Sequence, residues 1–192
     1  MNRTIRIAAT ASIALALAAC DRADETAISN ETDNASLANA SGGGDSNATA
    51  PVAAADFANQ IAASDRFEIE SGQLAANKAT SAEVKSFAQM LLRDHQKSTA
   101  DLKAAAAQAT PQLTPDPALD AEKQGMLSGL QAANSADFDR LFIEQQLAAH
   151  EKALALLQSY SAGGDSESLR GFAAQAASVV EGHLEKVRGL RQ

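Results

Sequence analysis

Apolar positions along most of the chain repeat with the period of an α-helix rather than with the alternation of a strand. At about 100° per residue, four stretches each gather apolar side chains on one face. The first two stretches span residues 55–79 and 81–109; the third starts after Ser135, a candidate N-cap, and the fourth near Ser166. The largest side chains on these faces are Phe57, Ile61, Ile69, Phe87, Leu91, Leu92, Leu102, Phe138, Phe142, Leu156, Tyr160, Leu169, Phe172 and Leu184.

The connections between these helices restrict the topology. Short connections around Thr80 and over residues 161–165 predict two antiparallel hairpins. The connection over residues 110–134 is much longer, contains three prolines and includes a short helical stretch. Because a helix of ~24 residues is only ~36 Å long, this connection can cross the whole bundle. We predict an all-α fold over residues 53–192: a ferritin-like four-helix bundle with a long crossover that carries a short helix. A plain up-and-down bundle is the alternative.

The N-terminal segment has the layout of a signal peptide. Arg3 and Arg6 precede an uncharged apolar run from Ile7 to Ala19, which is shorter than the ~20 residues of a membrane-spanning helix. The run ends in Leu17-Ala18-Ala19-Cys20, which resembles the bacterial lipobox. We therefore predict a lipoprotein signal peptide over residues 1–19, with Cys20 as the lipidated N-terminus; ordinary cleavage that leaves Cys20 as a free thiol is the alternative.

Residues 20–52 have the composition of a disordered tether. They are rich in Asn, Ser, Ala and Gly and contain no aromatic residue. The expected location is the cell envelope, on the periplasmic side, with a lipid anchor in the inner or the outer membrane. Asp21 after the cysteine resembles an inner-membrane retention signal of enterobacterial lipoproteins, but this rule transfers poorly between bacterial groups. The choice between the inner and the outer membrane therefore stays open. The net charge of −8 argues against a nucleic acid partner.

All three histidines lie on or near the apolar faces. His95 is on the second long helix, His150 on the third and His183 on the fourth, while Glu68 and Asp65 lie along the apolar face of the first. Burying ionisable groups costs free energy unless they are paired or coordinate a metal. The pattern therefore predicts either a polar network or a metal site inside the bundle.

Several of these segments also carry a resemblance to a known family. They are Phe67-Glu68-Ile69-Glu70-Ser71-Gly72-Gln73-Leu74-Ala75, Val84 to Met90 leading to Asp94-His95, Phe138-Asp139-Arg140, Ala149-His150-Glu151 and His183-Leu184. In these stretches the chain resembles the bacterial domain-of-unknown-function family numbered 4142. The resemblance implies an exported protein with a ferritin-like four-helix fold, often labelled an outer membrane protein, and implies no established reaction.

The histidines depart from the pattern of a ferritin-like di-iron site, which uses Glu-x-x-His on two helices. Leu92, Leu147 and Val180 occupy the positions three residues before the histidines, so a carboxylate-bridged di-iron oxidase is disfavoured. An imidazole-rich site for Fe, Cu or Zn remains. The candidate ligands are His95, His150, His183, Glu68 and Asp65, and the candidate supporting residues are Asp94, Asp139 and Gln146.

The expected hairpin turns test whether one metal can reach all three histidines. A turn at residues 79–80 sets Asp65 nearly level with His95. A turn at residues 163–164 sets His183 level with Glu144, ~9 Å along the axis from His150. These expected positions argue against, but do not exclude, a single metal site that uses all three histidines.

Two function classes stay open. The first is metal binding or metal-dependent redox protection in the envelope. The second is a non-enzymatic envelope protein whose histidines form a polar network, with its function in a partner-binding surface or in stress adaptation. The chain has no nucleophile elbow and no glycine-rich phosphate loop, which disfavours a hydrolase. Whether the protein is an enzyme stays open, and the sequence favours one that is not.

Overall fold

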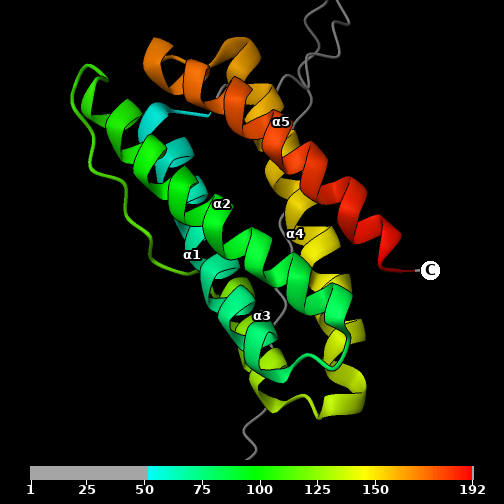
Figure 1. Cartoon of the computed structure of the whole chain (residues 1–192). Helices are drawn as coiled ribbons and strands as arrows, with labels where there is room; N and C mark the ends of the chain where they lie inside the picture. Colours follow the sequence, from blue (N-terminus) through cyan, green and yellow to red (C-terminus); the bar gives the residue numbers. More distant parts are fainter. Residues whose placement is uncertain (1–51, 192) are drawn as a thin grey trace, which may run out of the picture. The chain divides into compact units, whose positions relative to one another are not determined.

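The structure, a computed structural model, describes residues 52–191 and contains five helices (Figure 1). These are α1 (Ala54–Lys78), α2 (Ala82–Ala107), α3 (Ala121–Ala132), α4 (Ser135–Gly163) and α5 (Glu167–Gly189). The predicted all-α fold and the short helix in the crossover are confirmed. The predicted signal peptide, Cys20 and nearly all of the tether lie outside the described residues. Within residues 52–191, no helix is both long and apolar enough to cross a membrane.

Side-chain caps fix where three of the helices begin. Ser81 Oγ accepts hydrogen bonds from the backbone N–H groups of Glu83 and Val84 at the start of α2. Asp120 caps α3 in the same way. The cap of α4 is Asn134 and not Ser135 as predicted, because Asn134 Oδ1 accepts from the two N–H groups that follow Ser135.

The long crossover makes α2 and α4 parallel. Near the start of α4, Asp139 accepts hydrogen bonds from the N–H groups of Thr80 and Ser81, which precede α2. At the other end of the bundle, Ser168 in the first turn of α5 donates to the carbonyl of Ala105 in the last turn of α2. The chain therefore returns along the length of the bundle between α2 and α4, as Figure 1 shows, and the up-and-down alternative is excluded.

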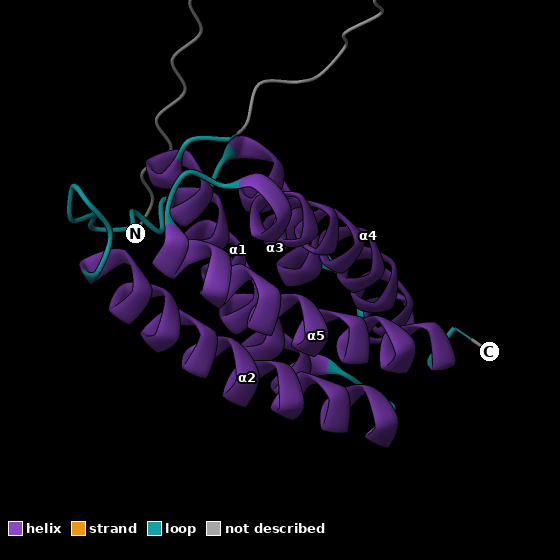
Figure 2. Ribbon diagram, turned by 90° about the horizontal axis from the view of Figure 1, so that it is seen from above, coloured by secondary structure: helices purple, strands orange, loops and turns teal. Residues whose placement is uncertain are grey.

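The four long helices pack in the ring order α1, α2, α5, α4, so each has two neighbours (Figure 2). Aromatic residues fill the two ends of the core. Phe57 stacks on Tyr160 at one end, with ring centroids 3.8 Å apart, and Phe138 lies beside Phe142 at the other. The polar centre lies between these two apolar layers.

The turn between α4 and α5 lies further along the chain than predicted. Helix α4 continues through Gly163, so the connection is reduced to residues 164–166. The centre of the connection therefore moves from between residues 163 and 164 to residue 165, toward the register in which His183 faces His150 rather than Glu144. His150 Nε2 and His183 Nδ1 are 3.2 Å apart, so the predicted axial separation of these two residues is wrong.

Candidate metal centre

The three histidines meet in the middle of the bundle, although α2, α4 and α5 each supply one. One ring nitrogen from each of His95, His150 and His183 lies within 4.8 Å of the other two. All three residues are buried. The helix register predicted from the sequence argued against a site that uses all three histidines. The structure nevertheless brings all three together.

Each imidazole is held by its outward nitrogen. His95 Nδ1–H donates to Asp65 Oδ1 at 2.8 Å, and His183 Nε2–H donates to Asp94 Oδ2 at 3.0 Å. His150 Nδ1–H donates to the backbone carbonyl of Gln146 at 2.9 Å. Histidines that bind metals almost always donate their other N–H to a carboxylate or a backbone carbonyl. All three imidazoles have this arrangement.

The inward nitrogens consequently carry the lone pairs in the neutral imidazoles. His150 Nε2 and His183 Nδ1 then face each other with lone pairs, which repel unless a proton or a cation lies between them. Their separation of 3.2 Å is close to the ~3.3 Å between two tetrahedral ligands at a metal–nitrogen distance of about 2.0 Å. His95 Nε2 is buried and has no hydrogen-bond partner among the described residues.

Burial and nearby charges give the three imidazoles different proton affinities. For His95, burial lowers the pKa, but the hydrogen bond that His95 donates to Asp65 and the charges of Glu68, Asp65 and Asp94 together raise it above the ordinary value. Burial and the neighbouring imidazoles hold the pKa of His150 well below the ordinary value. Burial lowers the pKa of His183 as well, despite its hydrogen bond to Asp94. A proton on the centre therefore prefers His95, and His150 and His183 are held neutral, which is the form that binds metals.

The carboxylates proposed as ligands lie behind the imidazoles. Asp65 contacts the outward nitrogen of His95. Glu68 Oε1 is 3.7 Å from the outward nitrogen of His150, and Glu68 Oε2 is buried without a hydrogen-bond partner among the described residues. Burial raises the pKa of Glu68 to about 7. Of the five ligands predicted from the sequence, the structure brings the three histidines together and keeps these two carboxylates on the outer side.

Two of the three candidate supporting residues contact a histidine of the centre, and the third does not. Asp94 holds His183, and the backbone of Gln146 holds His150, while the Gln146 side chain donates to Ser71 Oγ at 3.1 Å. Asp139 is not at the centre, because it lies near the start of α4 and accepts hydrogen bonds from the N–H groups of Thr80 and Ser81. Sequence reasoning missed Thr99, whose hydroxyl donates to the His95 carbonyl and lies 3.3 Å from Asp65 Oδ2. Its position four residues after His95, on the same helix face, was the available signal.

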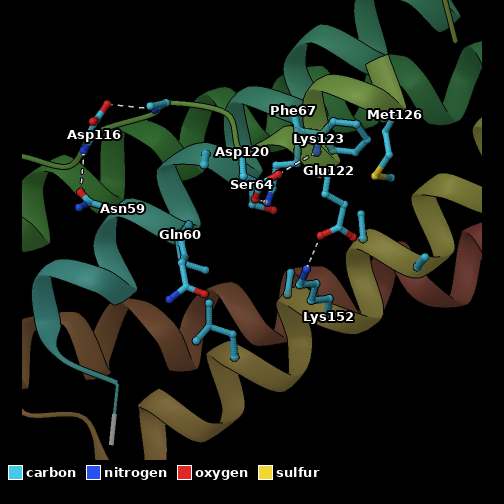
Figure 3. Close-up of a pocket in the computed structure, with 17 residues that line it drawn as sticks. Asn59, Gln60, Ser64, Phe67, Asp116, Asp120, Glu122, Lys123, Met126 and Lys152 are labelled. Atoms are coloured by element: carbon cyan, nitrogen blue, oxygen red, sulfur yellow. Dashed lines mark hydrogen bonds and ion pairs between the residues drawn. The ribbon is translucent and has the colours of Figure 1, made fainter. Parts of the chain in front are cut away.

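Two cavities flank the α1–α4 contact. A cavity of about 250 Å³ has His95 and His183 in its wall. A larger one, of about 400 Å³, lies between α1, the crossover, α3 and α4 and has no histidine in its wall (Figure 3). Its two lysines are neutralised there, Lys123 by Asp120 and Lys152 by Glu122. The smaller cavity is therefore the one connected with the histidine centre.

Comparison with known proteins agrees with this fold. The family model "Domain of unknown function (DUF4142)" matches residues 31–190. The chain therefore belongs to this family, as the sequence resemblance implied. None of the curated proteins matches the chain.

Two solved structures share the fold. "CopM in the Cu(II)-bound form" has a TM-score of 0.59 and 19% sequence identity, and the alignment covers 70% of this chain and 92% of that one. "CopM in the Cu(I)-bound form" has the same score and identity and covers 72% and 94%. At this identity the similarity shows a common helical fold.

Proposed function

We propose that this DUF4142 protein binds one transition-metal ion in the middle of its bundle, with His95 Nε2, His150 Nε2 and His183 Nδ1 as ligands. The observation that carries the proposal is the position of His95 Nε2. This nitrogen is buried, it has no hydrogen-bond partner among the described residues, and its histidine belongs to the same cluster as two other imidazoles. A buried acceptor without a donor costs about 1–3 kcal/mol, whereas a metal ion would use all three lone pairs at once.

The donor set bears on which metal binds. Neutral imidazoles suit copper, zinc and iron, and they contribute no negative charge to the ion. The two aspartates behind His95 and His183 would offset the charge of a divalent cation and raise the basicity of the ligands. Copper is the first ion to test, because the CopM structures with the same fold are copper-bound.

The test is metal analysis of the full chain, purified in detergent without a polyhistidine tag. We expect one equivalent of metal after exposure to copper, zinc or iron and removal of loosely bound ions. A metal bound to the folded state raises the melting temperature in proportion to RT ln(1 + [L]/Kd). His95→Ala is expected to lose both the bound metal and the thermal shift. The matched control is Gln96→Ala, at the exposed next position of the same helix.

The second candidate function is a structural polar network without metal. It is favoured by the two carboxylate–imidazole pairs, since Asp65–His95 ties α1 to α2 and Asp94–His183 ties α2 to α5. Such a network would fix the register of the helices, and function would then reside on the protein surface. Substoichiometric metal and an unchanged melting temperature would favour this reading over metal binding.

We also propose that the protein is exported and anchored through a lipid on Cys20. The support is the lipobox-like Leu17-Ala18-Ala19-Cys20 after an apolar run of signal-peptide length. The test is incorporation of labelled fatty acid into the protein expressed in bacteria. We expect label in the wild type and none in Cys20→Ser, and label in neither would count against lipidation.

A further inference from the structure

We infer that Phe87 closes the centre against a fourth ligand, so that a bound ion has only the three imidazoles and the site prefers Cu⁺ to Cu²⁺ and Zn²⁺. The inference rests on the proposed metal site and adds to it an oxidation state and the residue that selects it. Its basis is the position of the Phe87 ring, which lies between the histidines and a groove on the protein surface.

The Phe87 ring lies beside two of the histidines. Its centroid is 6.4 Å from that of His150 and 6.5 Å from that of His183. The ring also packs edge-on against Phe142, with centroids 6.3 Å apart, which holds it in place. Phe87 lines a surface groove between the start of α2 and the end of α5, and the wall of this groove contains no histidine. Only 4% of Phe87 is exposed. The ring therefore separates the histidines from the groove.

The cavity beside His95 and His183 does not reach the inward nitrogens either. This cavity of about 250 Å³ has Asp65 and Asp94 in its wall, and these aspartates contact the outward nitrogens of the two histidines. His150 does not line the cavity, and His95 Nε2 is buried. A water molecule in this cavity therefore meets the outer edges of the imidazoles and not the position between them.

The described side chains offer no fourth ligand at the inward nitrogens. Among residues 52–191, the only group of three or more histidine, cysteine or carboxylate side chains placed to hold a metal is the histidine triad itself. Glu68 lies 3.7 Å from the outward nitrogen of His150. The Gln146 amide contacts Ser71 and Glu68 instead of the inward nitrogens. An ion at this position therefore has three neutral nitrogen ligands.

Three-fold coordination separates the candidate ions. Zn²⁺ in proteins is almost always four-coordinate, with water in the fourth position where the protein supplies only three ligands. Cu²⁺ prefers tetragonal sites of nitrogen and oxygen ligands. Cu⁺ has a filled d shell and is stable with three nitrogen ligands in one plane. A centre that excludes water therefore favours Cu⁺.

Burial also favours the smaller charge. Moving an ion from water into a dry site costs more free energy when its charge is larger, and none of the three ligands is negative. Asp65 and Asp94 reduce this cost for either charge, but each acts across an imidazole. The Asp94 side chain is also 37% exposed, so water screens its charge. Coordination number and charge thus select the same ion.

The experiment measures the affinity of the full chain, purified in detergent without a polyhistidine tag, for Cu⁺, Cu²⁺ and Zn²⁺ by chelator competition, with Cu⁺ kept reduced under nitrogen. We expect Cu⁺ to bind at least about tenfold more tightly than either divalent ion, because the shell around the site excludes water. X-ray absorption should show three nitrogen ligands around Cu⁺ and no fourth. Azide should leave the spectrum of the Cu²⁺-loaded wild type unchanged, because an anion does not reach the ion.

Phe87→Ala removes the ring and opens the centre to the groove, where Arg93 and Lys186 outnumber Glu83 and attract anions. We expect azide to produce a new charge-transfer band of Cu²⁺ in this variant, and the preference for Cu⁺ to fall about tenfold. The matched control is Phe138→Ala, which removes an equally buried ring more than three turns before His150 on α4. Azide should leave the spectrum of the control unchanged.

Phe87→Leu, with Phe138→Leu as its control, covers the case in which the alanine variants fail to fold, and the wild-type measurements depend on no variant. If Cu²⁺ or Zn²⁺ binds as tightly as Cu⁺, if Cu⁺ has a fourth ligand, or if azide binds to the Cu²⁺-loaded wild type, the inference is wrong and the metal site stands. Folded Phe87 variants that exclude azide as the wild type does would overturn the role of Phe87. Failure of all metals to bind, or metal retained by His95→Ala, would overturn the proposed function and this inference with it.

Discussion

Replacing Glu68 by glutamine is expected to stabilise the metal-free protein in a pH-dependent way. Glu68 is only 1% exposed, and its Oε2 has no hydrogen-bond partner among the described residues. Burial raises its pKa to about 7, partly opposed by the charge of His95 and by the Gln146 side chain. The folded protein therefore keeps a proton on Glu68 that the unfolded chain has already lost.

The magnitude follows from the pKa difference. The shift runs from 4.5 to about 7, and at ~1.4 kcal/mol per pKa unit it corresponds to about 3 kcal/mol. Because the folded-state pKa is raised, the stabilisation from this group is complete below pH 4.5 and is lost as the pH rises through 7. Glutamine has the shape of the protonated acid and nothing to titrate. The difference in unfolding free energy between Glu68→Gln and wild type should therefore grow by about 3 kcal/mol between pH 4.5 and pH 8.5.

The assay is urea unfolding of both proteins at several pH values, with chelator present so that no metal contributes. The control is Glu185→Gln on the exposed face of α5, which makes the same chemical change at a carboxylate that is not buried. Curves for Glu68→Gln and wild type that run parallel from pH 4.5 to pH 8.5 would refute the reasoning, because they would mean that Glu68 titrates alike in the folded and unfolded states.

Three further predictions concern the centre and the hairpin that positions it. Asp94→Asn should weaken metal binding about 10- to 100-fold in a chelator competition, since Asp94 orients His183. Because the pKa of His95 is raised, protons compete with the metal, so the apparent metal affinity should fall by up to about tenfold for each pH unit below that pKa. Gly164→Ala should lower the free energy of unfolding by about 1–3 kcal/mol, because its methyl group would lie 2.4 Å from the buried Tyr160 ring, whereas Gly163→Ala, with open space around it, should not.

Much of the fold follows from periodicity, because the apolar repeat reports which face of a helix is buried. His95, His150 and His183 were placed on or near inward faces from this repeat, and the structure buries all three. The turn at residues 79–80 also set Asp65 level with His95 correctly, as their hydrogen bond shows. The connection between α1 and α2 is so short that neither helix could extend further and shift the register.

The second hairpin was misplaced for a physical reason. Two adjacent glycines favour a turn, but Gly163 stays helical and only Gly164 ends the helix, where its N–H bonds to the Tyr160 carbonyl. Packing of Tyr160 on Phe57 holds this last turn in place, and that contact joins residues far apart in the chain. The two adjacent glycines alone therefore gave the wrong register for α4 and α5. For this reason the contact between His150 and His183 was not predicted.

The same dependence on register decided what the carboxylates do. The apolar repeat places Glu68 and Asp65 on an inward helix face. Whether such a carboxylate lies beside the inward or the outward nitrogen of an imidazole depends on the axial offset between the two helices. In this bundle they lie at the back, while Leu92, Leu147 and Val180 fill the positions where a di-iron protein has its Glu-x-x-His glutamates. Carboxylates behind His95 and His183 orient these imidazoles and leave the three inward nitrogens as neutral donors. The bundle topology is thus kept without the di-iron ligand pattern, so the proposed metal site predicts a stoichiometry of one metal per chain rather than two, and this ratio is the decisive measurement.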